Sequence, residues 1–469
     1  MKKFITNSFR LKAFALSTFL GICTLTGIAQ NQSEYSQNNI SKENKKSLKS
    51  PKKSNKIVKL MSDGGWCWYQ DPRAVISKGK LIIAGLSGVS GDVRIGVYDL
   101  KNEKMLGEHT LHKDFERDDH NVPALHVRSD GSILAVWAKH SVEKKHYYSI
   151  SDPNDYLKWG ETKTFTHDYE GKQGVTYMNL LTIKNEGLLY NIFRDGLNYN
   201  PTFITSTDEG ATWKNRTHFI ANDVSGFQRP YARYFQKDEN TIGISYSDAH
   251  PRDYGNSLYY VEYHDGGFYT VSGKKIKDLS EGPLKTKEGE KIYIGSETKV
   301  KPKGADSVPN SAWTSTMSTD KKGNPVIGYT VTINDHDHRY RMAKWNGKKW
   351  IDREVAYAGD GLYPAESSYI GLITLDPTNP KRAFIATEVN PKTGEPFAKN
   401  NEIYTAKIKN GADIKNIKWK PITANSNHKN LRPMVVAGEG YKVVMWLNGP
   451  WATYKDYDSN VMGIVLEKP

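Results

Sequence analysis

The sequence contains very little cysteine. Only Cys23 and Cys67 occur among its 469 residues. Cys23 lies in an N-terminal segment that we expect to be removed during export, so Cys67 alone would remain. No intrachain disulfide is then available, although an exported protein would meet an oxidising compartment.

Long apolar runs are also scarce. The run Ala13–Ile28 follows four basic residues and precedes the small residue Ala29. It is too short for a comfortable membrane span, and this order of basic, apolar and small residues is typical of a secretory signal. We therefore predict a signal peptide over residues 1–29 and a secreted protein, extracellular or periplasmic, with no transmembrane segment.

A lipoprotein is the alternative at this end of the chain. Cys23 follows Leu20-Gly21-Ile22, although Ile22 is a poor residue beside a lipidation site. After the signal, residues 30–56 are rich in Asn, Ser and Lys and have almost no large apolar side chains. Such a segment cannot bury enough apolar surface to fold, so we predict a disordered leader.

The chain lacks a strong charge once this leader is set aside. Residues 1–56 hold 11 of the 66 Lys/Arg and 2 of the 52 Asp/Glu, which leaves a net charge of +5 for residues 57–469. The high overall pI of 9.2 is thus no argument for nucleic acid, and we expect no such partner. A locally positive groove for an anionic polymer stays open.

No amphipathic helix long enough for an α/β fold is evident. Instead, a turn with Gly, Asn or Asp is followed seven times by a run of β-branched or aromatic residues. The seven segments are KGKLIIAGLSG from Lys78, SDGSILAVWAKH from Ser129, KNEGLLYNIFRDG from Lys184, ENTIGISYSDAHP from Glu239, KKGNPVIGYTV from Lys321, NPKRAFIATEVN from Asn379 and GEGYKVVMWLNG from Gly438. Seven repeats of one inner strand predict an all-β fold, a monomeric seven-bladed β-propeller over residues 57–469.

A second repeat supports this fold. STDEGATW, Ser206–Trp213, fits the bacterial neuraminidase or Asp-box pattern, in which Asp and Gly shape a hairpin turn and Trp packs between strands. WNGKKW at 345–350 and YHDGGFY at 263–269 look like degenerate hairpins at equivalent positions. The role of these repeats is structural, so they say nothing of chemistry.

Chemistry in a propeller collects on one face, where inner strands end and loops begin. His140, Arg194 and His250 close three of the repeated segments, and His120 and Tyr177 precede two of them. Histidine titrates near neutrality and arginine binds a carboxylate through two hydrogen bonds. This combination favours acid/base chemistry on an acidic substrate.

Eight motifs together resemble a known group of proteins. They are SDGGWCWYQDPRAV from Ser62, DDHNVPAL from Asp118, GVTYMNL from Gly174, FRDG from Phe193, STDEGATW from Ser206, RPYARY from Arg229, SDAHPR from Ser247 and HDHRYRMAKWNGKKW from His336. From about Met61 to about Trp350 the chain resembles the Asp-box-repeat proteins that include the seven-bladed ulvan lyases of marine bacteria. This resemblance implies a carbon–oxygen lyase that cleaves a sulfated, uronate-containing algal polysaccharide by β-elimination and leaves a 4,5-unsaturated uronate.

The resemblance also implies roles for individual residues. A lyase must neutralise the uronate carboxylate, remove the C5 proton and assist the leaving oxygen at C4. His120 is the candidate base, with Tyr177 as acid, or as base for the opposite C5 epimer. His140 and Arg194 would bind the carboxylate, and Tyr231 could assist the leaving group.

Weaker candidates lie in the same motifs. Tyr246 could replace Tyr231 at the leaving group, and Arg229 and Arg73 could contact sulfate or carboxylate. The partner implied is an anionic sulfated polysaccharide. His126 is expected to face the other side of the molecule.

A structural zinc site is a further hypothesis. His250 and the DHDH cluster follow neighbouring repeats, and alternation along a strand would put His336 and His338 on one side. Three imidazoles near a carboxylate could hold zinc, although no cysteine lies near them. The elimination chemistry itself would need no cofactor.

Two other functions use the same fold. A sialidase-like glycoside hydrolase needs an arginine cluster, a Tyr nucleophile supported by Glu, and an acidic proton donor. The expected Arg-Ile-Pro segment is absent, DPR at Asp71–Arg73 stands there instead, and paired carboxylates are not evident. A noncatalytic glycan-binding propeller would keep aromatic platforms but would not need His120 and Tyr177 together.

Overall fold

The computed structural model describes residues 56–469 except 69, 71, 223–228 and 410. All of these belong to one structural unit, residues 51–469. The predicted signal peptide and all but the last residue of the predicted leader lie outside the described residues. Among the described residues, no helix is long and apolar enough to cross a membrane.

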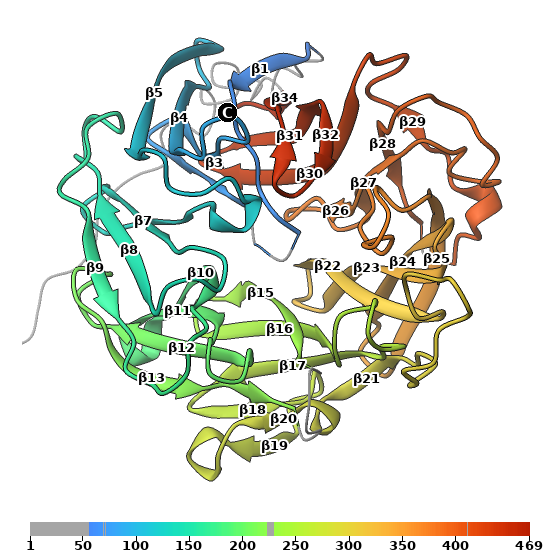
Figure 1. The fold of residues 1–469 in the computed structure, drawn as a ribbon, viewed down its shortest axis with the longest axis horizontal. Coiled ribbons are helices and arrows are strands. Elements are labelled where there is room, and N and C mark those ends of the chain that lie inside the picture. Colours follow the sequence, from blue (N-terminus) through green and yellow to red (C-terminus); the bar gives the residue numbers. More distant parts are fainter. Residues whose placement is uncertain (1–55, 69, 71, 223–228, 410) are drawn as a thin grey trace, which may run out of the picture. The chain divides into compact units, whose positions relative to one another are not determined.

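Seven antiparallel sheets follow one another along the chain and surround a central axis (Figure 1). The first three are β2(Ala74–Ser77)–β3(Lys80–Leu86)–β4(Val93–Asp99)–β5(Lys104–His112), β6(Ala124–Val127)–β7(Ile133–Trp137)–β8(Lys145–Ile150)–β9(Lys163–Thr166) and β10(Thr176–Ile183)–β11(Leu188–Arg194)–β12(Pro201–Ser206)–β13(Lys214–His218). The fourth is β15(Tyr231–Asp238)–β16(Thr241–Ser247)–β17(Leu258–His264)–β18(Gly267–Tyr269)–β19(Lys275–Asp278), with β21(Glu290–Tyr293) also paired to β17. The predicted seven-bladed propeller is therefore confirmed.

The remaining sheets complete the ring. They are β22(Ser311–Thr319)–β23(Pro325–Asn334)–β24(Asp337–Trp345)–β25(Trp350–Gly359), β26(Ile373–Leu375)–β27(Arg382–Thr387)–β28(Glu402–Lys407)–β29(Lys420–Pro421) and β30(Lys429–Gly438)–β31(Tyr441–Gly449)–β34(Asn460–Glu467)–β1(Val58–Met61). The last blade thus takes its outer strand from the start of the described chain, with Val58 opposite Gly463. This pairing of distant segments covers an edge that would otherwise stay open.

Short elements lie in the connections. Two small ladders join β14(Ile220–Ala221) to β20(Leu284–Lys285) and β32(Trp451–Thr453) to β33(Asp456–Tyr457). The described helices are all single 3-10 turns: η1(Asp119–Asn121), η2(Lys184–Glu186), η3(Leu279–Glu281), η4(Thr286–Glu288) and η5(Ile414–Asn416). Of these, η1 and the β32–β33 turn matter for the site described below.

The repeated segments of the sequence are the second strands of the blades, not the innermost ones. The first strands, β2, β6, β10, β15, β22, β26 and β30, contact one another around the axis. The repeated runs are their neighbours β3, β7, β11, β16, β23, β27 and β31. A second strand is paired on both edges and covered on both faces, so every residue of β7 and β16 is buried, and β7 is continuously apolar.

Strand direction determines where functional side chains lie. Because first and second strands are antiparallel, Thr176 at the start of β10 pairs with Arg194 at the end of β11, and Tyr231 pairs with Ser247. The starts of first strands and the ends of second strands therefore share one face of the ring, which we call the site face. The opposite ends define the far face.

The Asp-box turn plays the predicted structural role. It joins β12 to β13, the third and fourth strands, and Asp208 accepts hydrogen bonds from the backbone N–H and hydroxyl of Thr212 at 2.8 and 2.7 Å. Gly210 has a φ of +89°, and Trp213 is buried against His146 of the preceding blade. YHDGGFY and WNGKKW occupy the equivalent turns β17–β18 and β24–β25.

Candidate active site

One buried aspartate holds two stacked histidines on the site face. The turn η1 presents His120, and Asp118 caps this turn by accepting the His120 backbone N–H at 3.1 Å. Asp118 Oδ1 lies 2.6 Å from His120 Nδ1, and Oδ2 lies 3.0 Å from His140 Nδ1. The two imidazole rings are stacked with centroids 3.9 Å apart. Since Nδ1 of each ring faces the carboxylate, Nε2 is left for chemistry.

Asp118, His120 and His140 differ in the direction and cause of their pKa shifts. Burial opposes ionisation of Asp118, but His120 and His140 hold its pKa well below the usual range. Burial would also lower the pKa of His120, yet Cys67, Tyr177 and Asp118 together raise it well above 6.5. Burial and the charge of His120 lower the pKa of His140 to about 3. At neutral pH the pair therefore carries one proton more than two neutral rings, and it resides on His120.

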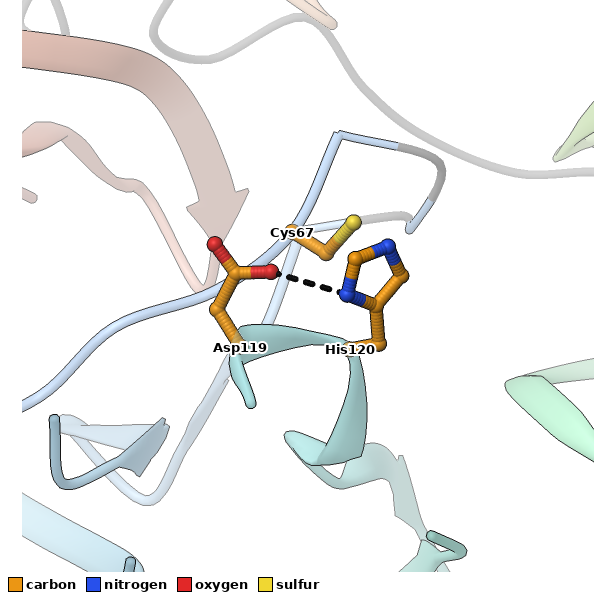
Figure 2. A group of neighbouring side chains, drawn as sticks. All are labelled: Cys67, Asp119 and His120. Carbon is orange, nitrogen blue, oxygen red and sulfur yellow. Dashed lines mark ion pairs between the residues drawn. The ribbon is translucent and has the colours of Figure 1, made fainter. Parts of the chain in front are cut away.

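A second buried ion pair, between Asp119 and Arg432, holds η1 in place. Asp119 Oδ1 lies 3.2 Å from His120 Nδ1 (Figure 2). Its Oδ2 lies 2.5 Å from Nη1 of Arg432, whose side chain is fully buried. Arg432 has a φ of +54° next to an irregularity in β30, where the register shifts between Leu431 and Met434. Such a bulge redirects a side chain that a regular strand would aim elsewhere.

A similar irregularity in β10 directs Tyr177 toward the histidines. Its φ is +64°, and the β10–β11 register shifts between Thr176 and Asn179. The Tyr177 ring lies 5.4 Å from that of His120, and the Arg194 guanidinium carbon lies 4.7 Å from the centre of the Tyr177 ring. Arg194 also donates to Ser141 Oγ at 2.9 Å. A bulky residue with positive φ is uncommon, which points to a functional constraint.

Two tyrosines of the site differ in their electrostatic surroundings. Burial raises the pKa of Tyr177, and the nearby His120 and Arg194 only partly oppose this. Tyr231 is equally enclosed, but the charges of Arg229, Arg194 and Arg252 outweigh burial and lower its pKa from 10. Arg229 donates through Nε to the Tyr231 hydroxyl at 3.4 Å. Tyr231 is thus the phenol better prepared to become an anion.

A carboxyl with a raised pKa completes the site. Burial raises the pKa of Glu366 to about 7, although Arg252 pairs with it. The backbone N–H of Arg252 donates to His250 Nδ1 at 3.0 Å, which leaves the proton of neutral His250 on Nε2, 3.5 Å from Glu366 Oε2. The His250 ring packs 5.5 Å from Tyr231 and 4.7 Å from Trp313.

The structure brings together most of the predicted site residues. His120, His140, Tyr177, Arg194, Tyr231, Arg229 and His250 share contacts on the site face. The prediction for Tyr246 is wrong in its location: its side chain is fully buried within blade 4, stacks on Tyr259 at 5.3 Å and donates to the Thr286 carbonyl at 3.0 Å. Tyr246 therefore belongs to the core.

The predicted zinc ligands do not converge. His336 is largely exposed beside Asp360, 3.0 Å away, whereas His338 is buried with Nδ1 3.0 Å from the Gly359 carbonyl. His250 lies elsewhere, against Glu366. Among the described residues, potential donor groups of three are Cys67–Asp119–His120 and Asp118–His120–His140. In both groups the carboxylates already contact Arg432 or a histidine ring.

Several site residues escaped the sequence analysis. Asp118 and Asp119 stand in the DDHN motif beside His120, and adjacency to a candidate histidine was the available signal. Tyr454 and Lys455 come from the β32–β33 turn of blade 7. The Tyr454 ring lies 5.0 Å from that of His120, and Lys455 Nζ lies 3.6 Å from Asp118 Oδ2. Nothing local in the sequence marks this turn, or Glu366, as part of a site.

Comparison with known proteins agrees with this architecture. The family model described as BNR repeat-containing family member matches residues 84–358, more than half of the chain. The chain belongs to this family. No curated protein matches its sequence. The family membership and the propeller confirm the resemblance drawn from the sequence motifs.

Solved structures with a similar fold are known. Two are of a PL25 ulvan lyase, described as a new family of polysaccharide lyase, and one of them is bound to -[GlcA(1-4)Rha3S]-. Both are 16% identical, cover 88% of this chain and 96% of their own, and give TM-scores of 0.59 and 0.58. The polysaccharide lyase Uly1 is 12% identical, with a TM-score of 0.54 over 88% of this chain and 100% of its own. At these identities the likeness concerns the fold.

Proposed function

We propose that this protein is a polysaccharide lyase that cleaves a sulfated, uronate-containing polysaccharide of the ulvan type by β-elimination. The observation that carries the proposal is the grouping of a histidine cation, an arginine and two tyrosines of different acidity in one buried cluster. These are the groups that elimination next to a carboxylate requires. The uronate and sulfated rhamnose bound by one structure of similar fold give the substrate class.

The carboxylate would be bound by Arg194. This guanidinium lies against Tyr177 and is anchored through Ser141, so its position is fixed before substrate arrives. A planar guanidinium binds a carboxylate through two hydrogen bonds. Neutralising the carboxylate acidifies the adjacent C5 proton, which is the first requirement of the reaction. His140 and Tyr177 would complete this contact.

The directions of two pKa shifts support an assignment of the acid and the base. His120 carries a proton at rest, whereas Tyr231 has its pKa lowered by three arginines. We therefore assign Tyr231, as phenolate, to removal of the C5 proton and His120, as imidazolium, to the leaving oxygen. The C5–H electron pair forms the C4–C5 double bond, the C4–O bond breaks, and the departing oxygen takes the His120 proton. No water is consumed. This exchanges the roles that sequence resemblance gave to His120 and the tyrosines.

Hydrolysis is the competing function, and Glu366 is the observation in its favour. A carboxyl with a pKa of about 7 can act as a general acid. A hydrolase also needs a second, available carboxylate across the scissile bond. Asp118 is enclosed by two histidines and Asp119 by Arg432, so neither is available. Elimination therefore gives a role to more of the residues in the site than hydrolysis does.

The direct experiment combines purified residues 57–469 with ulvan. Elimination predicts a rise in ultraviolet absorbance from the conjugated double bond, together with oligosaccharides that have gained no water by mass spectrometry. New reducing ends without that absorbance would mean hydrolysis. No cleavage of ulvan or of a panel of uronate polymers would leave glycan binding as the function of the fold.

A further inference from the structure

Two adjoining hollows on the far face are lined by basic residues. One, of about 770 Å³, has five cations and no acidic residue in its lining: Arg382, Lys407, Lys409, Lys418 and Lys420. The other, of about 1090 Å³, shares Asn379, Arg382 and Lys407 with the first and adds Lys321, Lys322, Lys344, Arg353, Lys381 and Lys442. The two hollows therefore form one continuous surface on blades 5 to 7.

The few acidic residues in this surface are already paired. Asp320 lies 2.8 Å from Lys344 Nζ. Asp376 and Glu467 lie 3.0 and 3.1 Å from Lys442 Nζ. These two lysines are thus neutralised within the protein.

The other nine cations form no ion pair with a described residue. We call them the basic strip: Lys321, Lys322, Arg353, Lys381, Arg382, Lys407, Lys409, Lys418 and Lys420. Residues 57–469 have a net charge of only +5. Nine unpaired cations around two joined hollows are therefore a strong local concentration of positive charge. Such a surface attracts polyanions over a distance set by ionic strength.

The basic strip is separate from the candidate active site. Arg382 begins β27 and Lys407 ends β28, whereas the site face lies where second strands end. The strip is consequently at the opposite ends of the strands from His120 and Tyr177. The strip residues therefore take no direct part in the chemistry at that site.

We propose that the basic strip is a second, noncatalytic binding surface for a sulfated polysaccharide chain. Amide and hydroxyl groups of Asn379, Asn416 and Thr405 lie in the linings and suit sugar hydroxyls. Neither lining contains Phe, Tyr or Trp, so single-stranded nucleic acid would find no surface for base stacking. The identity of the polymer rests on the proposed function, but the existence of the surface does not.

The test uses dextran sulfate, which is sulfated and contains no uronate to be eliminated. Lys409→Glu, Lys418→Glu and Lys420→Glu are combined in one variant of the intact chain, and affinity is measured at low salt by titration calorimetry. We expect binding at least about tenfold weaker than in the unmodified protein, because three attractive charges become repulsive. Neutral dextran should not bind to the strip.

A matched variant controls for net charge. Lys163→Glu, Lys214→Glu and Lys274→Glu make the same charge change at exposed, unpaired lysines of blades 2, 3 and 4. This variant should bind within about twofold of the unmodified protein, and both variants should keep its thermal midpoint. Equal loss in both variants, or no loss in the strip variant, would overturn the proposal.

Two further outcomes separate the possibilities. Duplex DNA or phosphatidylserine vesicles bound through the strip as tightly as dextran sulfate, at matched salt, would overturn the assignment to polysaccharide. Activity on short oligosaccharides should be unchanged in the strip variant. Failure of the proposed lyase function would appear as absent double-bond absorbance with every polymer, while a positive result for the strip would still stand.

Discussion

The two faces of this propeller use positive charge in different ways. On the site face, the cations are buried and fixed: protonated His120 shares Asp118 with neutral His140, Arg432 pairs with Asp119, and Arg194 lies on Tyr177. On the far face, the basic strip is mostly exposed and unpaired. A buried charge is poorly screened by water, so it can shift the pKa of a neighbouring group. An exposed charge is screened by salt, and it attracts a polyanion without fixing the position of any one group.

The largest effect should come from the site face, on removing a proton-transfer group. Tyr231→Phe deletes the proposed base while keeping the ring between His250 and Trp313. We expect kcat on ulvan to fall by about a thousandfold, as is usual for loss of a general base. Tyr246→Phe is the matched control, because it removes a buried hydroxyl in the core; kcat should stay within about twofold. Comparable activity in both variants would remove Tyr231 from the mechanism.

Asp118→Asn should have the next largest effect. The amide keeps the shape but removes the anion between the two histidines, so the pKa of His120 should fall. Less His120 is then charged at a given pH, and kcat should drop by about a hundredfold. The unmodified rate should rise with pH as Tyr231 loses its proton, and fall above the raised pKa of His120. In the variant the falling limb should move to lower pH, and an unmoved limb would contradict the role of His120 as acid.

Arg194→Lys tests whether the fixed geometry of the site face matters beyond its charge. Lysine keeps the charge but cannot form the two parallel hydrogen bonds, and it loses the contact with the Tyr177 ring. We expect KM for the polymer to rise about tenfold with a smaller fall in kcat. Initial rates over a range of ulvan concentrations separate the two parameters. Unchanged KM would place the carboxylate contact elsewhere.

Glu366 offers a test through stability. Its pKa is about 7 in the folded protein against 4.5 for the unperturbed group, so the folded state holds this proton more tightly. The unfolding free energy should therefore fall as pH rises from about 4.5 to 7, by at most about 3 kcal/mol. Glu366→Gln should remove this part of the pH dependence in urea denaturation. Identical slopes for both proteins would show that Glu366 is not buried as described.

The smallest effect belongs to the far face. Raising salt from low to physiological ionic strength should weaken polymer binding to the unmodified protein more than to the Lys409, Lys418 and Lys420 variant, because exposed charges are the ones that salt screens. The rate at saturating polymer should hardly change. A salt response that is the same in both proteins would place the attraction outside the basic strip.

The blades could be read from the sequence for a physical reason. Each second strand is enclosed on both faces, so β3, β7 and β11 appear as continuous apolar runs after a turn. The second strands all run in one direction, so the residues that follow them and those that precede the first strands lie on the site face. His120, His140, Tyr177 and Arg194 could therefore be predicted from the sequence. The innermost strands have less regular patterns, so the repeat in the sequence identifies the second strands instead.

The errors have equally physical causes. Tyr246 is one residue from the end of β16, and strand alternation turns it into the blade core. Asp118 and Asp119 look like ordinary turn residues until η1 folds and Arg432 approaches from 313 positions away. Glu366, Tyr454 and Lys455 reach the site through long connections of the last blades. Contacts of this kind depend on closure of the ring and leave no local pattern in the sequence.

Bond cleavage at the site face should consume no water. The most direct measurement is to run the reaction on ulvan in isotopically labelled water and analyse the products by mass spectrometry. Elimination predicts no heavy oxygen in the newly formed ends, together with a conjugated double bond at each cleavage. One heavy oxygen per cleavage, without the double bond, would show instead that the reaction is hydrolysis.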